Sequence, residues 1–242
     1  TQTGGTALFG ANTAPENSRG VFEIINTGVD GTSSFNLSGA STVFALVHAQ
    51  SAPEAGTFII GEGVSTSVSS DPFIDFGFNG SVEGATYQND LNETYQITSA
   101  TALPNIRVNN DGSNSPVLEM VIQPLTVTDN IQILNGGSLL ANGFDLTVNS
   151  GFTNNGTYTP GSNTTTFNGG SQTIAGTTAT TFNNLLVNTS TGLTLSNAIS
   201  VSGDMSVTSG IFNDNGNIVS LNGDLNATTN ITGTGGITMT GT

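Results

Sequence analysis

The side chains that could perform chemistry in this chain are few, and most are carboxylates. Its 242 residues include 17 Asp or Glu, two Arg, one His, no Lys and no Cys. The one imidazole, His48, follows an apolar run at 43–47 and has no acidic neighbour in sequence. Because a Ser-His-Asp triad needs a carboxylate that orients the imidazole, we interpret His48 as a strand residue that faces solvent or packs at a sheet edge.

Two carboxylates have a spacing that could pair them. Asp204 and Asp224 end the similar tripeptides Ser-Gly-Asp and Asn-Gly-Asp, at an offset of 20 residues. Paired carboxylates supply the acid and the base of glycoside hydrolysis. Repeated turns, however, repeat their residues in any case, and the chain after residue 124 holds five Asp and no stronger base. We therefore expect no catalytic residues and a protein that is not an enzyme; a carbohydrate-active enzyme is an alternative if acids and Arg107 converge in one groove.

Calcium is the remaining chemistry that the acidic residues suggest. The loops at 109–114 and 213–217 contain Asp111 and Asp214 among Asn, Gly and Ser, and Ca²⁺ takes carboxylate and carbonyl oxygens. Neither loop has the spaced acids and terminal Glu of an EF-hand, so an Asx turn that needs no ion explains both loops better. We expect no cofactor, with Asp111 and Asp214 as the calcium candidates.

Composition limits the possible partners. The formal charge is −15, which repels phosphate backbones and excludes nucleic acid as a partner. No apolar stretch approaches 18 residues, so we expect no transmembrane segment. Glycan sites usually present aromatic platforms, yet the chain has no Trp and only Tyr87, Tyr95 and Tyr158. We assign the 13 Phe to the core.

The residues that must position these groups are themselves unusual. Thr, Gly, Asn and Ser account for 124 residues, which excludes long helices. Twelve of the 17 acids, both Arg and the His precede residue 124. The sequence therefore has a charged first half and an almost uncharged second half.

The second half contains a repeat of apolar pairs separated by one polar residue. The pairs recur every six residues and keep their phase across an insertion at 213–217. They are Leu193/Leu195, Ile199/Val201, Met205/Val207, Val219/Leu221, Leu225/Ala227 and Ile237/Met239. Each pair predicts a three-residue strand with two inward side chains, and the intervening Gly, Asn and Ser predict a turn.

Three such hexads close one coil of a parallel β-solenoid, for which right-handed winding is expected. Each coil takes about 18–21 residues, which predicts about six or more coils over residues 99–242. The final hexad has no cap after it, so we expect the solenoid to continue beyond residue 242 in a longer chain.

The first half has conventional strand signals. Eight short apolar and β-branched runs, bounded by Gly, Pro, Asn and Ser, predict a β-sandwich-like domain over residues 1–98, with a boundary that could lie as late as 123. In one run Phe73 and Asp75 alternate with Ile74 and Phe76, which predicts a strand with Asp75 on its solvent face. The fold class is therefore all-β: an N-terminal sandwich followed by a parallel solenoid.

From about Tyr95 onwards, a series of phrases resembles the repeat regions of large cell-surface proteins of Bacteroidetes, the gliding-adhesin-like substrates of type IX secretion. The phrases are YQI at 95–97, LPNIRVNN at 103–110, PLTVT at 124–128, GFTNNGTY at 151–158, TFNGGSQTIAG at 166–176 and TFNNLLVN at 181–188. The resemblance implies an extracellular cell-surface protein that passes through the type IX export machinery. It also implies a role as adhesin or stalk, with glycan or protein ligands.

These observations together predict a structural or adhesive surface protein, a rod-like stalk or adhesin fragment in cell attachment or gliding. A self-assembling filament subunit is the main alternative, because an open solenoid end can pair with a neighbour. An ice-binding protein is a further alternative, since Thr is the commonest residue. That alternative requires Thr-X-Thr pairs on one flat face, and the pairs at 164–166, 232–234 and 238–240 do not share one coil phase.

Overall fold

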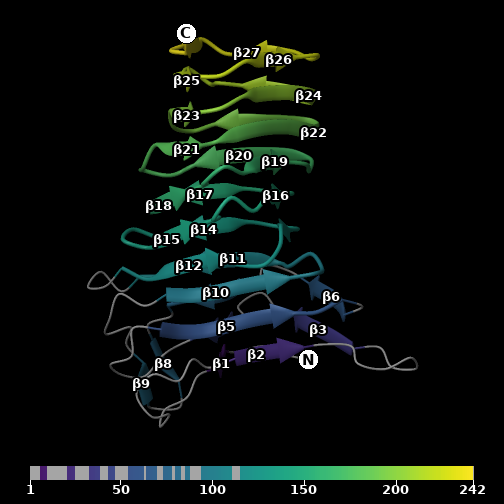
Figure 1. Ribbon diagram of the computed structural model, residues 1–242, viewed down its shortest axis with the longest axis vertical. Helices are drawn as coiled ribbons and strands as arrows, with labels where there is room; N and C mark the ends of the chain where they lie inside the picture. The colour runs from purple at the N-terminus through teal and green to yellow at the C-terminus, as the bar shows by residue number, and fades with distance from the viewer. Residues whose placement is uncertain are drawn as a thin grey trace.

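The computed structural model is all-β and has no helix in the part of the chain that it describes. The described residues are 6–9, 21–24, 33–38, 43–46, 54–62, 64–69, 73–77, 80–82, 85–87, 94–110 and 115–241. A parallel β-solenoid of about seven turns forms a stack along the long axis (Figure 1). The predicted all-β class and parallel solenoid are thus confirmed.

Each turn of the solenoid contributes strands to three faces, and every pairing within them is parallel. The first face contains β10 (Thr94–Ser99), β12 (Val117–Met120), β15 (Ser138–Leu140) and β18 (Thr157–Thr159), followed by β21 (Thr180–Phe182), β23 (Ile199–Val201), β25 (Val219–Leu221) and β28 (Ile237–Met239). The second face contains β13 (Leu125–Val127), β16 (Leu146–Val148), β19 (Thr164–Phe167), the first parts of β22 (Asn184–Leu195) and β24 (Met205–Asn213), and β26 (Leu225–Ala227). The third face contains β11 (Asn105–Val108), β14 (Ile131–Ile133), β17 (Phe152–Asn154), β20 (Ser171–Ala175), the second parts of β22 and β24, and β27 (Ile231–Thr232).

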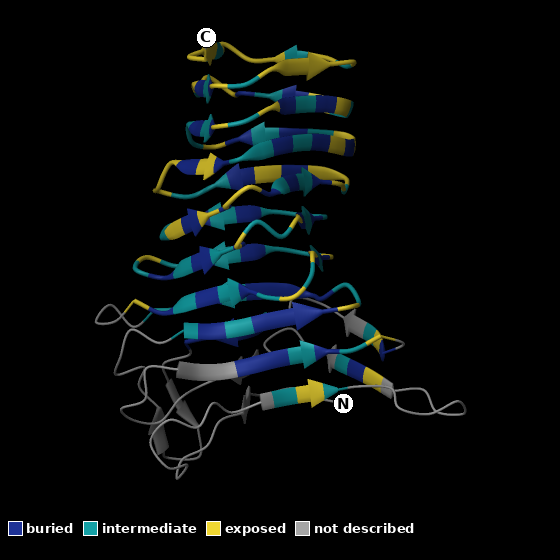
Figure 2. Cartoon of the chain, viewed as in Figure 1, coloured by how far each residue is buried: buried dark blue, intermediate teal, exposed yellow. Residues whose placement is uncertain are grey.

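The inward side chains stack in columns along the axis. In the second face the successive partners are Leu125, Leu146, Thr165, Leu185, Met205 and Leu225, which lie 19 to 21 residues apart. All of them except Leu225 are buried, so the predicted coil length and apolar axis are confirmed there. Figure 2 shows the buried residues along the interior and the exposed last turn at the C-terminal end.

The corners bring the main chains of neighbouring turns close together. A Cβ atom on Gly169 would overlap the backbone oxygen of Asn149 in the turn before it. Gly at such a corner therefore provides the space that neighbouring turns need for their 4.8 Å spacing.

Strands before residue 98 join the same ladders. β2 (Val21–Ile24) and β5 (Glu54–Ile60) pair in parallel and extend the first face through β10. β1 (Thr6–Phe9), β4 (Val43–Leu46) and β7 (Phe73–Phe76) extend the third face through β11. β3 (Ser33–Ser38) and β6 (Val64–Ser69) also pair in parallel, and only β8 (Gly80–Val82) and β9 (Ala85–Tyr87) are antiparallel among the described strands.

This arrangement differs from the antiparallel pairing that a sandwich over residues 1–98 would show, because period-2 alternation encodes a strand but not its direction. β10 itself crosses residue 98 and pairs on both sides. The division into two domains stays a prediction for the residues outside the described ranges.

Candidate functional site

The two carboxylates that the repeat brings together lie at the corner before the second face. Asp204 Oδ1 accepts a hydrogen bond from the backbone N–H of Asp224 (2.8 Å), and Asn184 Oδ1 accepts one from the N–H of Asp204 (2.9 Å). Two turns earlier, Asp145 Oδ1 accepts the N–H of Thr164 in the same way (2.7 Å). Each side-chain oxygen therefore holds the next turn in place, which gives the 20-residue offset a structural cause.

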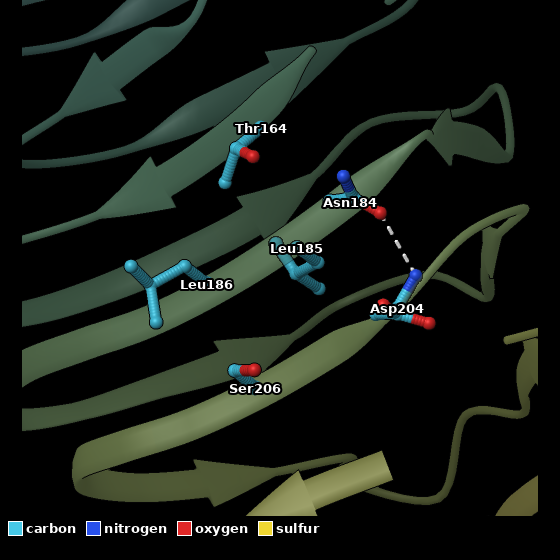
Figure 3. A pocket seen from close by; sticks show the side chains of 6 residues that line it. All are labelled: Thr164, Asn184, Leu185, Leu186, Asp204 and Ser206. Atoms are coloured by element: carbon cyan, nitrogen blue, oxygen red, sulfur yellow. Dashed lines mark hydrogen bonds between the residues drawn. The ribbon is translucent and has the colours of Figure 1, made fainter. Parts of the chain in front are cut away.

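A shallow depression of about 230 Å³ lies beside this corner. Figure 3 shows its lining, which comes from β19, β22, β24 and the turns before them. The lining residues are Thr164, Asn184, Leu185, Leu186, Asp204 and Ser206. One carboxylate, one amide and two hydroxyls, with no cationic side chain or imidazole among them, do not provide the acid and base pair that hydrolysis requires.

Asp214 lies in the loop after β24, and its carboxylate is buried. Oδ1 accepts the backbone N–H of Gly216 (2.9 Å) and of Gly235 (2.8 Å), and Oδ2 accepts that of Gly236 (3.0 Å). The N–H groups of Gly235 and Gly236 in the following turn lower the pKa of Asp214 below its ordinary value of 3.8. Asp214 is therefore an ionised anchor for the last turn.

This geometry bears on the calcium prediction. The groups that face the Asp214 carboxylate are N–H donors, which suit an anion, whereas Ca²⁺ needs several oxygen ligands. No group of three or more metal-ligating side chains occurs within the described ranges. Asp111, the second candidate, lies outside the described residues.

The prediction that Asp75 faces solvent is wrong. Asp75 is 0% exposed, and its Oδ2 accepts hydrogen bonds from the Nε (3.0 Å) and Nη2 of Arg107 and from the Nδ2 of Asn109 (3.1 Å). The Arg107 guanidinium also lies 4.7 Å from the ring centroid of Phe73. Burial raises the pKa of Asp75, against the opposing charge of Arg107.

Arg107 therefore meets one acid in a buried ion pair between β7 and β11, and not the acids of the corner. Sequence reasoning missed this pair because its partners are 32 residues apart and in register only after parallel pairing. The signal available was an acid flanked by Ile and Phe in one strand and an Arg between Ile and Val in another.

The other candidates have structural settings or lie outside the described part. Tyr95 and Tyr158 are buried, and the Tyr158 hydroxyl bonds with Thr165 Oγ1 (2.8 Å), so neither forms a glycan platform. The placement of His48 and the side chain of Tyr87 are not described. The Thr-X-Thr pairs begin in β19, β27 and β28, which belong to three different faces, as expected.

Within the described residues there is no helix long and apolar enough to cross a membrane. Comparison of the chain with protein-family models, curated proteins and solved structures found no match.

Proposed function

We propose that this chain is a structural or adhesive element of a cell surface, a rod-like stalk or adhesin fragment outside the cell. The observation that supports this proposal best is the continuity of the ladders. Three parallel faces run through the solenoid, and Asn, Asp, Ser and Thr side chains add bonds between turns at the corners. Seven turns at about 4.8 Å each give a rod on the order of 35 Å long.

Such a rod transmits force because load along its axis acts on many backbone hydrogen bonds together. The corner bonds connect residues about 20 positions apart, so each turn is fixed to the next independently of the core. The resemblance of residues 95–242 to gliding-adhesin-like repeat regions supports the extracellular location, type IX export, and glycan or protein ligands as the targets of attachment.

Attachment by cells that produce the chain, with and without its coding region, tests this function. Intact cells would be labelled with an antibody against the purified chain, and their adhesion to glass and to glycan-coated surfaces would be counted under flow. We expect surface labelling, and reduced attachment after deletion. Labelling only after cell lysis, or unchanged attachment on every surface, would contradict the proposal.

A self-assembling filament subunit is the alternative that one observation favours. In the last described turn the inward positions Leu225 and Met239 are 39% and 53% exposed, and β26, β27 and β28 each pair on one side only. An edge of this kind can accept further parallel strands. Negative-stain microscopy of native material separates the two functions, since fibres support the filament and single short rods support the stalk.

A further inference from the structure

We propose that Asn135 is a site of spontaneous chemical modification, at which the side-chain amide becomes a carboxylate through a succinimide intermediate. Asn followed by Gly is the sequence most open to this reaction, because Gly has no Cβ to hinder attack by its own backbone nitrogen. The chain has seven such pairs, beginning at Asn79, Asn135, Asn142, Asn155, Asn168, Asn215 and Asn222. Asn79 is outside the described residues, which leaves six pairs to compare.

In five of the six pairs the reacting nitrogen is held by a hydrogen bond. The N–H of Gly143 donates to Pro160 O (3.2 Å), that of Gly156 to Asn154 Oδ1 (3.1 Å), that of Gly169 to Gln172 Oε1 (3.1 Å), that of Gly216 to Asp214 Oδ1 (2.9 Å) and that of Gly223 to Gly203 O (3.0 Å). Each bond directs the nitrogen towards an acceptor and must break before the nitrogen can attack its neighbouring side chain.

The sixth pair differs. Asn135 and Gly136 are the central residues of a turn that is closed by the N–H of Gly137 donating to Leu134 O (2.9 Å). Gly136 has a φ of +85°, typical of a type II turn, in which the central N–H takes no part in closure. Across the described ranges this N–H and the exposed Asn135 side chain have no hydrogen-bond partner.

The surrounding contacts fix the turn without occupying the reacting atoms. Asn110 Nδ2 donates to the backbone oxygen of Asn135 (2.6 Å), and the N–H of Thr157 in the next turn donates to Gly137 O (2.9 Å). The turn is therefore ordered, while the nitrogen of Gly136 and the amide of Asn135 remain free to react.

The reaction is balanced with water alone. The Gly136 nitrogen forms a bond to the Asn135 Cγ, and the side-chain nitrogen leaves as ammonia. Water then opens the ring at either carbonyl and gives Asp or isoaspartate at position 135. Either product adds one negative charge, and isoaspartate also lengthens the main chain between β14 and β15 by one methylene.

Incubation of the full chain in warm, mildly alkaline buffer tests the proposal. Because the chain has no Lys and only two Arg, peptic digestion would precede mass spectrometry, and each Asn-Gly peptide would be followed for amide-to-acid conversion. Breaking one ordinary hydrogen bond first slows a reaction about twofold to tenfold. We expect Asn135 to convert faster than each of the other five by at least that factor, and to become a substrate for isoaspartyl methyltransferase.

Two controls separate structure from local sequence. Asn135→Gln should abolish the fast conversion, whereas Asn222→Gln, at a pair whose glycine N–H is bonded, should leave it unchanged. In denaturant the six rates should come close together. A pair other than Asn135 converting fastest in the folded chain, or the same ranking of rates in denaturant, would overturn the proposal.

Discussion

Replacing Asp214 by Asn should loosen the last turn of the solenoid while leaving the turns near residue 125 unchanged. The carboxylate accepts three backbone N–H groups at 2.8–3.0 Å, two of them from Gly235 and Gly236 in the following turn. Asn keeps one oxygen for two of these donors but presents an NH₂ group to the third. The variant therefore loses a charge-assisted hydrogen bond and places two donors against each other.

The magnitude follows from the bond that is lost. A hydrogen bond to a charged group contributes about 1.5–3 kcal/mol. In a solenoid each turn contacts only its neighbours, so the cost falls on local opening of the last turn. Such a change in free energy accelerates amide exchange there by about tenfold to a hundredfold.

Hydrogen exchange followed by mass spectrometry measures this directly. Peptides over residues 214–236 should exchange faster in the variant, and peptides over 125–148 should not change. Asp129→Asn is the matched control, because its carboxylate has a single long contact with a hydroxyl (3.5 Å). Equal protection of residues 214–236 in the wild type and the Asp214 variant would refute the anchoring role.

The same bond predicts a pH dependence. The folded pKa of Asp214 is lowered, so its contribution to stability is present above the ordinary value of 3.8 and is lost as the pH falls through the folded pKa. Protection of the last turn in the wild type should therefore decrease in acid, whereas the Asn variant should lack this decrease. An identical acid profile in both proteins would contradict the assignment of the shift to Asp214.

Three further substitutions test other contacts, each by chemical denaturation. Gly169→Ala should destabilise the chain by about 1–3 kcal/mol, since its Cβ would overlap the backbone of Asn149; an unchanged midpoint would contradict the close approach. Arg107→Leu should cost about 3–5 kcal/mol because it leaves the buried Asp75 carboxylate without its charge partner, and adding Asp75→Leu should recover much of that loss; a double variant no more stable than the single one would refute this. Tyr158→Phe should cost about 1–3 kcal/mol by removing the hydroxyl from two buried polar partners, and no change would show that those partners rearrange freely.

The regular part of the fold could be predicted because its period is short and repeated. The pair Leu193/Leu195 and the pair Met205/Val207 occupy inward positions and are buried, as the hexad pattern requires. The same pattern cannot show how much of the last turn is covered, so Leu225 and Met239 fit the phase yet remain exposed. Burial there depends on a neighbour and not on the residue.

The candidate site was less predictable because its contacts join distant residues. Asp204 and Asp224 were expected to stack, but only the register shows that one carboxylate accepts the backbone N–H of the other residue. Asp75 was placed on a solvent face because alternation assumes that one face of the strand is open. Long connections before residue 98 also remove the constant spacing that identified the coils later in the chain.

The corner bonds explain why half of this chain is small and neutral. Asn and Asp share a planar oxygen at the same distance from the backbone, so either accepts the N–H of the next turn, as Asn184 and Asp204 do. The position therefore requires an oxygen acceptor and not a charge. The second half can dispense with ion pairs because hydrogen bonds between turns take their place, and its few carboxylates act within the rod. Contacts that depend on charge are then to be sought in the first 123 residues, where twelve of the 17 acids lie.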